Sequence, residues 1–109
     1  MTISSREAGE VTIVEVEGNV DLSTSAALRR SLFATLVNAP KVALNLAAIR
    51  YIDSSGIATL IEVLKRSQNL KKQFVLFELS PAVQEVFRLT HVIRVFQVFE
   101  TEREALGTA

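Results

Sequence analysis

The chain contains no cysteine and no tryptophan, and it has only two prolines, four glycines and one histidine among its 109 residues. The lack of cysteine excludes disulfide bonds and thiolate chemistry, and it is compatible with a reducing compartment, so we expect a cytoplasmic protein. Lysine plus arginine and aspartate plus glutamate number 12 each, which gives a formal net charge of zero. A nucleic-acid-binding domain is expected to carry a basic excess, so this class is disfavoured.

Long hydrophobic runs are also lacking. No apolar segment is long enough to cross a bilayer, and residues 1–6 lack the apolar stretch of a signal peptide. We therefore expect neither membrane insertion nor a secretory leader. Hydrophobic residues nevertheless make up 49% of the chain, which is enough for a folded core. We expect residues 1–109 to form a single domain.

The apolar pattern alternates between strand-like and helix-like segments. Runs rich in β-branched and aromatic residues predict strands over 3–6, 11–17, 42–46, 74–79 and 94–99. Apolar residues at helical spacing predict helices over 22–37 and 57–70, a third one from Pro81 and a short fourth one after Thr101. The expected N-caps of the first, third and fourth helices are Ser23, Ser80 and Thr101. This order predicts an α/β fold with a mixed, mostly parallel sheet of four to five strands and about four helices.

Asp53, Ser54, Ser55 and Gly56 stand between an apolar strand and a helix. Asp and Ser are preferred at helix N-termini, because their side-chain oxygens accept hydrogen bonds from the free backbone N–H groups. These N–H groups and the helix dipole favour negative charge, so a serine at this position can carry a phosphate at low cost. The segment is thus a candidate switch, and a plain helix cap is the alternative for the segment taken alone.

Asp21 and Asp53 are the only aspartates of the chain, and both stand at a junction between a strand and a helix. In a parallel sheet such junctions share one edge, at the carboxyl ends of the strands, where α/β proteins form their sites. We therefore expect Asp21 to lie near the serine segment; the alternative is that both aspartates are only caps. Asn45, a polar residue in an apolar strand, is expected to bond the backbone near the same segment.

Motifs for catalysis or metal binding are missing. His91, the only histidine, could form a hydrolase triad with a serine and an aspartate, but there is no Gly-x-Ser-x-Gly elbow, and an exposed or satisfied histidine is the better interpretation. Two aspartates and one histidine without motif spacing do not predict a metal site. No Gly-rich phosphate loop is present, so we predict no cofactor and no enzymatic activity.

Four segments in this order and spacing resemble the STAS domain, and most closely the single-domain anti-sigma factor antagonists of bacteria. They are Gly-Asn-Val-Asp at 18–21, Val-Ala-Leu-Asn-Leu at 42–46, Tyr-Ile-Asp-Ser-Ser-Gly-Ile at 51–57 and Leu-Ser-Pro-Ala-Val at 79–83. The resemblance covers essentially the whole chain. It implies a binding protein that captures an anti-sigma factor, which is also a serine kinase, and so frees a sigma factor.

In this family the kinase uses ATP to phosphorylate the first serine after the aspartate, the complex dissociates, and a phosphatase restores the active form. The resemblance therefore implies Ser54 as the phosphorylation site. It places Asp21, Asp53, Ser55 and Gly56 in the partner-binding region around that serine.

The alternative within the same family is a STAS subunit of a bacterial lipid ABC transporter, or another scaffold that is never phosphorylated. The pair of Ser54 and Ser55 favours the phosphorylation switch, because the transporter subunits often carry threonine at the first position. A small hydrolase is the least favoured class.

Overall fold

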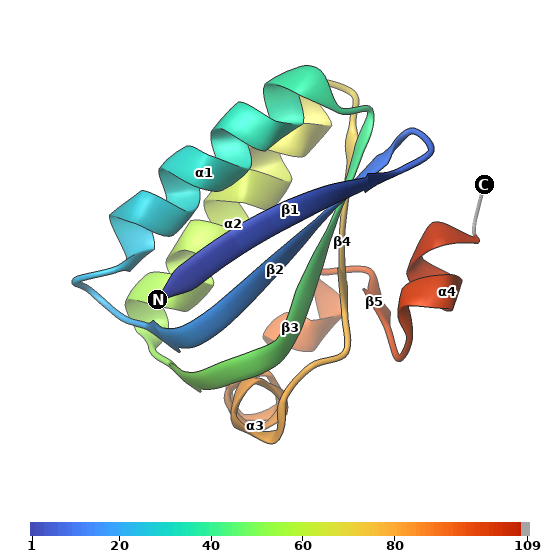
Figure 1. The fold of residues 1–109 in the computed structure, drawn as a ribbon. Helices are drawn as coiled ribbons and strands as arrows, with labels where there is room; N and C mark the ends of the chain where they lie inside the picture. The colour runs from blue at the N-terminus through green and yellow to red at the C-terminus, as the bar shows by residue number, and fades with distance from the viewer. Residues whose placement is uncertain (108–109) are drawn as a thin grey trace.

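The computed structural model describes residues 1–107, and its five strands form one sheet in the order β1-β2-β3-β4-β5 (Figure 1). The strands are β1 Thr2–Ala8, β2 Val11–Val20, β3 Lys41–Ile52, β4 Gln73–Phe77 and β5 Val98–Phe99. β1 pairs with β2 in antiparallel orientation, and all other neighbours are parallel. The predicted mixed, mostly parallel sheet is therefore confirmed, with five strands in the part of the chain that the structure describes.

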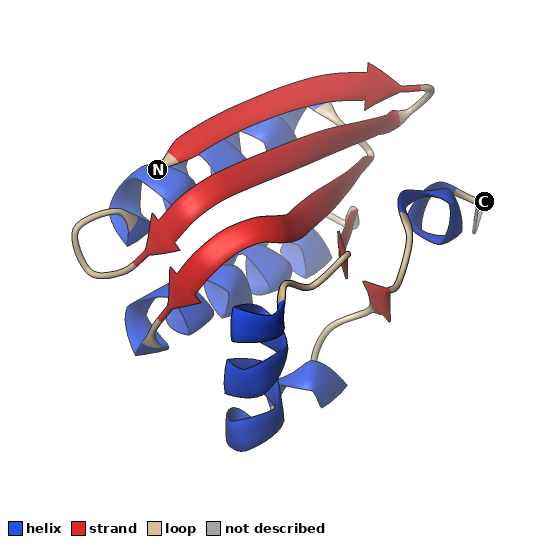
Figure 2. Ribbon diagram, turned by 60° about the horizontal axis from the view of Figure 1, so that its bottom comes forward, coloured by secondary structure: helices blue, strands red, loops and turns tan. Residues whose placement is uncertain are grey.

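Four α-helices accompany the sheet within residues 1–107. They are α1 Ser25–Asn38, α2 Ser54–Asn69, α3 Pro81–Thr90 and α4 Glu102–Leu106, and a 3-10 helix, η1 Val92–Arg94, follows α3. Helices α1, α2 and α3 lie on one side of the sheet, while α4 lies on the other side (Figures 1 and 2). None of the helices in the described range is long and apolar enough to cross a membrane.

The main core fills the space between the sheet and helices α1, α2 and α3. Its fully buried members include Leu28, Leu32, Leu44, Leu60 and Phe87. Leu28 and Leu32 come from α1 and Leu60 from α2, at the spacings of an amphipathic helix. The predicted burial is therefore confirmed at these positions, but not at Val37, which belongs to the predicted stripe of α1 and is 68% exposed.

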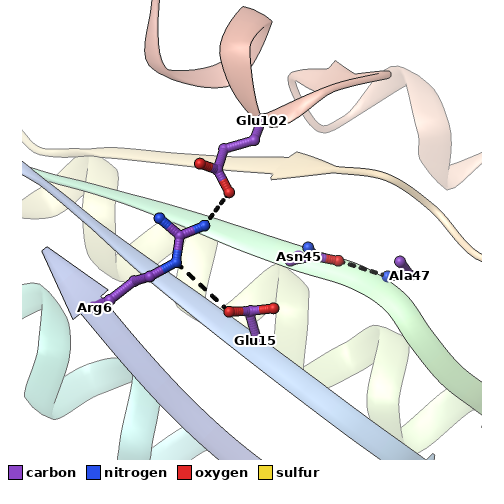
Figure 3. Close-up of polar contacts among 5 residues, drawn as sticks. All are labelled: Arg6, Glu15, Asn45, Ala47 and Glu102. Carbon is purple, nitrogen blue, oxygen red and sulfur yellow. Dashed lines mark hydrogen bonds and ion pairs between the residues drawn. The ribbon is translucent and has the colours of Figure 1, made fainter. Parts of the chain in front are cut away.

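A smaller apolar cluster lies on the opposite face of the sheet, beneath α4. It consists of Ile13, Ala43, Val75, Phe77 and Ala105. Arg6 of β1 contacts both Glu15 of β2, at 3.7 Å, and Glu102 at the start of α4 (Figure 3). The short last helix is thus fixed to this face by apolar burial and by one exposed arginine.

The predicted start of the first helix is wrong. The apolar pattern placed it at Leu22 with Ser23 as N-cap, but α1 begins at Ser25, with Thr24 at the N-cap position. The reason is that the N–H and the hydroxyl of Ser23 both donate to Oδ1 of Asp21, at 2.9 and 2.6 Å. These bonds hold the segment in a turn, and Ser23 is not available as a cap.

Several strand ends also need correction, since β2 continues to Val20 rather than ending at 17, and β4 ends at Phe77 rather than at 79. β3 does not end at Leu46 but continues to Ile52, because two irregularities in its register let it keep pairing with β2. The last strand was predicted over 94–99 but comprises only Val98–Phe99. His91 adopts a left-handed conformation, with φ of 58°, and the following residues turn into η1 before the chain extends again.

Two predicted caps are confirmed. The N–H of Val83 donates to Oγ of Ser80 at 3.2 Å, and Pro81 occupies the first turn of α3. The N–H of Glu104 donates to Oγ1 of Thr101, also at 3.2 Å, at the start of α4. Both helices therefore begin where capping residues in the sequence predicted.

Candidate functional site

β2 and β3 end side by side at the carboxyl edge of the sheet. Val20 pairs with Ile52, and the N–H of Asp53 donates to the carbonyl of Val20 at 3.2 Å. Asp21 and Asp53 follow this pair directly, so both lie at the same edge of the sheet as the start of the serine segment. The expectation that Asp21 lies near the serine segment is therefore confirmed.

Asp53 is the N-cap of α2. Its Oδ1 accepts hydrogen bonds from the N–H of Ser55 at 2.9 Å, from the hydroxyl of Ser55 at 2.6 Å and from the N–H of Gly56 at 3.3 Å. The hydroxyl of Ser55 is the main reason why the pKa of Asp53 lies below its ordinary value. Because this cap satisfies the first turn, α2 begins at Ser54, three residues before the predicted start at Ile57.

The two serines have different environments. Ser54 is the first residue of α2, its side chain is exposed, and its hydroxyl makes no hydrogen bond with any of residues 1–107. Ser55 is half-buried and donates its hydroxyl proton to Asp53. Ser54 therefore does not cap the helix, and its oxygen faces solvent at the N-terminal end of α2, where the dipole favours negative charge.

Gly56 is required by the close approach of α2 to the sheet. It is buried, and a Cβ atom at this position would lie 2.7 Å from Cγ1 of Ile52 and 2.8 Å from Cγ1 of Val20. These distances are shorter than van der Waals contact. The glycine thus lets the helix begin directly against the two strand ends that carry Asp21 and Asp53.

Asp21 organises the turn between β2 and α1. Besides its bonds to Ser23, its own N–H donates to Oγ1 of Thr24 at 2.9 Å, and the Thr24 hydroxyl donates to the carbonyl of Asn19 at 2.9 Å. The hydroxyl of Ser23 is the main cause that lowers the pKa of Asp21. The sequence pattern does not predict this role of Thr24, which falls inside the expected helix, although Ser or Thr two and three residues after an Asp is typical of such turns.

The other polar residues singled out in the sequence lie elsewhere. Asn45 does bond the backbone, but its Oδ1 accepts from the N–H of Ala47, at 2.8 Å in its own strand, and not from the serine segment (Figure 3). His91 is exposed at the C-cap of α3 and makes no side-chain hydrogen bond within residues 1–107. Over the same residues there is no group of three or more His, Cys, Asp or Glu side chains that could hold a metal ion.

The resulting site is an exposed hydroxyl at the positive end of a helix, next to two carboxylates. Asp21 and Asp53 both accept hydrogen bonds from neighbouring serines, which keeps them deprotonated at neutral pH and holds them in place. Such an arrangement can present a negatively charged surface to a protein partner. It also leaves the Ser54 oxygen open to a modifying enzyme.

The sequence pattern that defines the STAS domain matches residues 2–105, so the chain belongs to the STAS domain family. BtrV of Bordetella bronchiseptica, provisionally assigned as an anti-sigma factor antagonist, is 28% identical over 110 residues, which cover 100% of this chain and 94% of BtrV.

Two solved structures show the same fold. An anti-sigma factor antagonist from Mycobacterium paratuberculosis superposes with a TM-score of 0.88 at 23% identity, over 97% of this chain and 91% of the other. The unphosphorylated form of SpoIIAA, an anti-sigma factor antagonist, superposes with a TM-score of 0.79 at 17% identity, over 96% of this chain and 93% of the other. The predicted STAS-like architecture is therefore confirmed.

Proposed function

We propose that this protein is an anti-sigma factor antagonist. It binds an anti-sigma factor that is also a serine kinase, and this binding frees a sigma factor for transcription. Phosphorylation of Ser54 dissociates the complex, and a phosphatase restores the unphosphorylated form that binds the anti-sigma factor. The proposal places the protein in the cytoplasm with its partners and assigns it no catalytic activity of its own.

The observation that carries the proposal is the contrast between the two adjacent serines. The hydroxyl of Ser54 is exposed and without a hydrogen bond to residues 1–107, whereas the hydroxyl of Ser55 is bound to Asp53 at 2.6 Å. A kinase can reach the Ser54 oxygen without disturbing the cap of α2. Modification of Ser55 would break the bond that helps to hold Asp53, so Ser54 is the proposed acceptor.

Electrostatics explains how one phosphate would act as a switch. A phosphoserine carries about −1.5 to −2 charges at pH 7, and at residue 54 it would directly follow Asp53, whose carboxylate is already repelled by that of Asp21. The helix dipole makes this charge tolerable for the folded chain. A partner surface that fits the neutral hydroxyl would have to bury the phosphate without a counter-charge, which costs on the order of several kcal/mol and hence orders of magnitude in affinity.

The proposal is tested by incubating the protein with ATP and, one at a time, the purified serine-kinase anti-sigma factors of the organism that encodes it. We expect phosphopeptide mapping to find the label on Ser54, and Ser54→Ala to abolish it while the control Ser55→Ala retains it. A label on Ser55 alone would contradict the assignment. Binding to a transporter subunit, with no label from any kinase, would favour a non-phosphorylated STAS scaffold instead.

A further inference from the structure

Leu22 is the most exposed large apolar side chain within residues 1–107, with 82% of its surface accessible. A single exposed leucine is not unusual in a soluble protein. Leu22 differs in two respects: it lies in a turn that hydrogen bonds hold in place, and this turn is next to the Ser54 segment. It stands between Asp21 and Ser23, directly after the strand end that pairs with the start of the Ser54 segment.

The backbone around Leu22 is held by hydrogen bonds from both sides. Ser23 donates twice to Asp21, and Thr24 ties the turn to the carbonyl of Asn19 at 2.9 Å. The carbonyl of Asp21 also accepts from the N–H groups of Thr24 and Ser25, at 3.1 and 2.8 Å. The turn is thus fixed before any partner binds, so little backbone entropy is lost when Leu22 is buried.

The turn is also adjacent to the proposed switch. The ends of β2 and β3 lie next to each other in both ribbon views, with the loop to α1 and the start of α2 at the same edge (Figures 1 and 2). The hydrogen bond from Asp53 to Val20, at 3.2 Å, joins these two segments two residues before Leu22. We therefore expect a partner surface that covers Ser54 to reach the turn of Leu22 at the same edge.

We propose that Leu22 is the apolar anchor that determines which anti-sigma factor this protein binds. The complementary surface is an apolar pocket on the anti-sigma factor, bordered by an arginine or lysine side chain that faces Asp21, while the part that covers Ser54 carries no counter-charge for a phosphate. The inference rests on the proposed function, because it assigns a specificity residue to the same interface. Phosphorylation of Ser54 would weaken binding through the polar contacts of the interface, while the apolar contact of Leu22 would determine which partner is bound.

The test compares Leu22→Ala with two controls against each purified anti-sigma factor kinase of the organism, and the largest effect is expected with the kinase that binds the wild type most tightly. Truncation of a buried leucine is expected to raise Kd about tenfold or more. Leu22→Met conserves the volume and should stay close to wild type. Val37→Ala removes a similarly exposed side chain, 68% accessible, from the far end of α1. That control should leave Kd unchanged, and all three variants should melt close to wild type because neither side chain is buried.

A Kd for Leu22→Ala within twofold of wild type would overturn the inference. If phosphorylation of Ser54 still weakened binding in that case, the proposed function would stand without the anchor. If none of the kinases bound the wild-type protein, both the proposed function and the anchor would be contradicted. Equal weakening by Leu22→Ala against every kinase tested would reduce Leu22 to a general contact and contradict its role in partner choice.

Discussion

The backbone N–H of Asp53 donates a hydrogen bond to the carbonyl of Val20, at 3.2 Å, and this bond joins the ends of two neighbouring parallel strands. Through it, the turn that begins at Asp21 and the helix that begins at Ser54 become parts of one surface. The chain is folded so that its only two aspartates, each directly after a strand, lie at the same edge of the sheet as the exposed Ser54.

Replacing Ser54 should barely affect stability, because its hydroxyl is not part of the cap. We expect Ser54→Ala to change the free energy of unfolding by less than about 0.5 kcal/mol. Ser54→Asp adds a negative charge to the first turn of α2 and should stabilise the fold by roughly 0.3–1 kcal/mol at low salt. Urea denaturation of both variants checks this. A loss of about 1 kcal/mol or more in Ser54→Ala would show that the hydroxyl caps the helix after all.

Asp53 should make stability depend on acid pH. Its pKa is lowered in the folded protein, mainly by the hydroxyl of Ser55, so its contribution is fully present above the unfolded-state pKa of about 3.9. That contribution is lost as the pH falls through the lower folded-state value. Asp53→Asn removes this titration, so the difference in melting temperature between wild type and variant should shrink below about pH 4. A constant difference from pH 7 to pH 2.5 would exclude this role.

Gly56→Ala sets two opposing effects against each other. Helix propensity alone would stabilise the variant by up to about 1 kcal/mol. The added methyl group would lie 2.7 Å from the side chain of Ile52, and such overpacking typically costs about 1–3 kcal/mol. We expect the clash to prevail, since Val20 crowds the same position, and the free energy of unfolding should fall. A more stable variant would mean that α2 can move away from the sheet at no cost.

Asp21→Asn separates the charge of residue 21 from its structural role. An asparagine Oδ1 can still accept hydrogen bonds from Ser23, so the turn and the melting temperature should be preserved. The loss of charge should nevertheless change partner affinity or the rate of Ser54 phosphorylation. Calorimetry and a kinase time course on the same preparation provide the measurement. Unchanged values in both would assign Asp21 a purely structural role.

The sheet and its layers could be predicted from the sequence, because the alternation of β-branched strands with amphipathic helices leaves few topologies. The edge that carries the site could be predicted as well, since Asp21 and Asp53 both follow strands. The residues at which strands and helices begin and end were harder to predict. The extension of β3 to Ile52 depends on irregularities in its pairing with β2, and these are a tertiary property that no local pattern in 47–52 reveals.

The turn at 21–24 shows a second limit. The sequence predicts a helix from Leu22 because apolar residues recur at helical spacing from Leu28 onwards, and it predicts Ser23 as the cap because serine is preferred there. The structure instead uses Asp21 to bind Ser23, which leaves Leu22 outside the helix and exposed. Side-chain competition for the backbone decides this outcome. Helix propensity and hydrophobic periodicity do not predict which side chain will form these hydrogen bonds.

The proposed switch at Ser54 is tested most directly by the affinity of the purified anti-sigma factor kinase for four forms of this protein in one buffer. These are wild type, Ser54→Ala, Ser54→Asp and the enzymatically phosphorylated chain, which is included because a carboxylate carries less charge than a phosphate. We predict that Ser54→Ala binds as tightly as unmodified wild type, while the phosphorylated chain, although folded, loses at least two orders of magnitude in affinity. Ser54→Asp should be weakened although its fold is the more stable. A phosphorylated chain that binds as tightly as Ser54→Ala would contradict the switch.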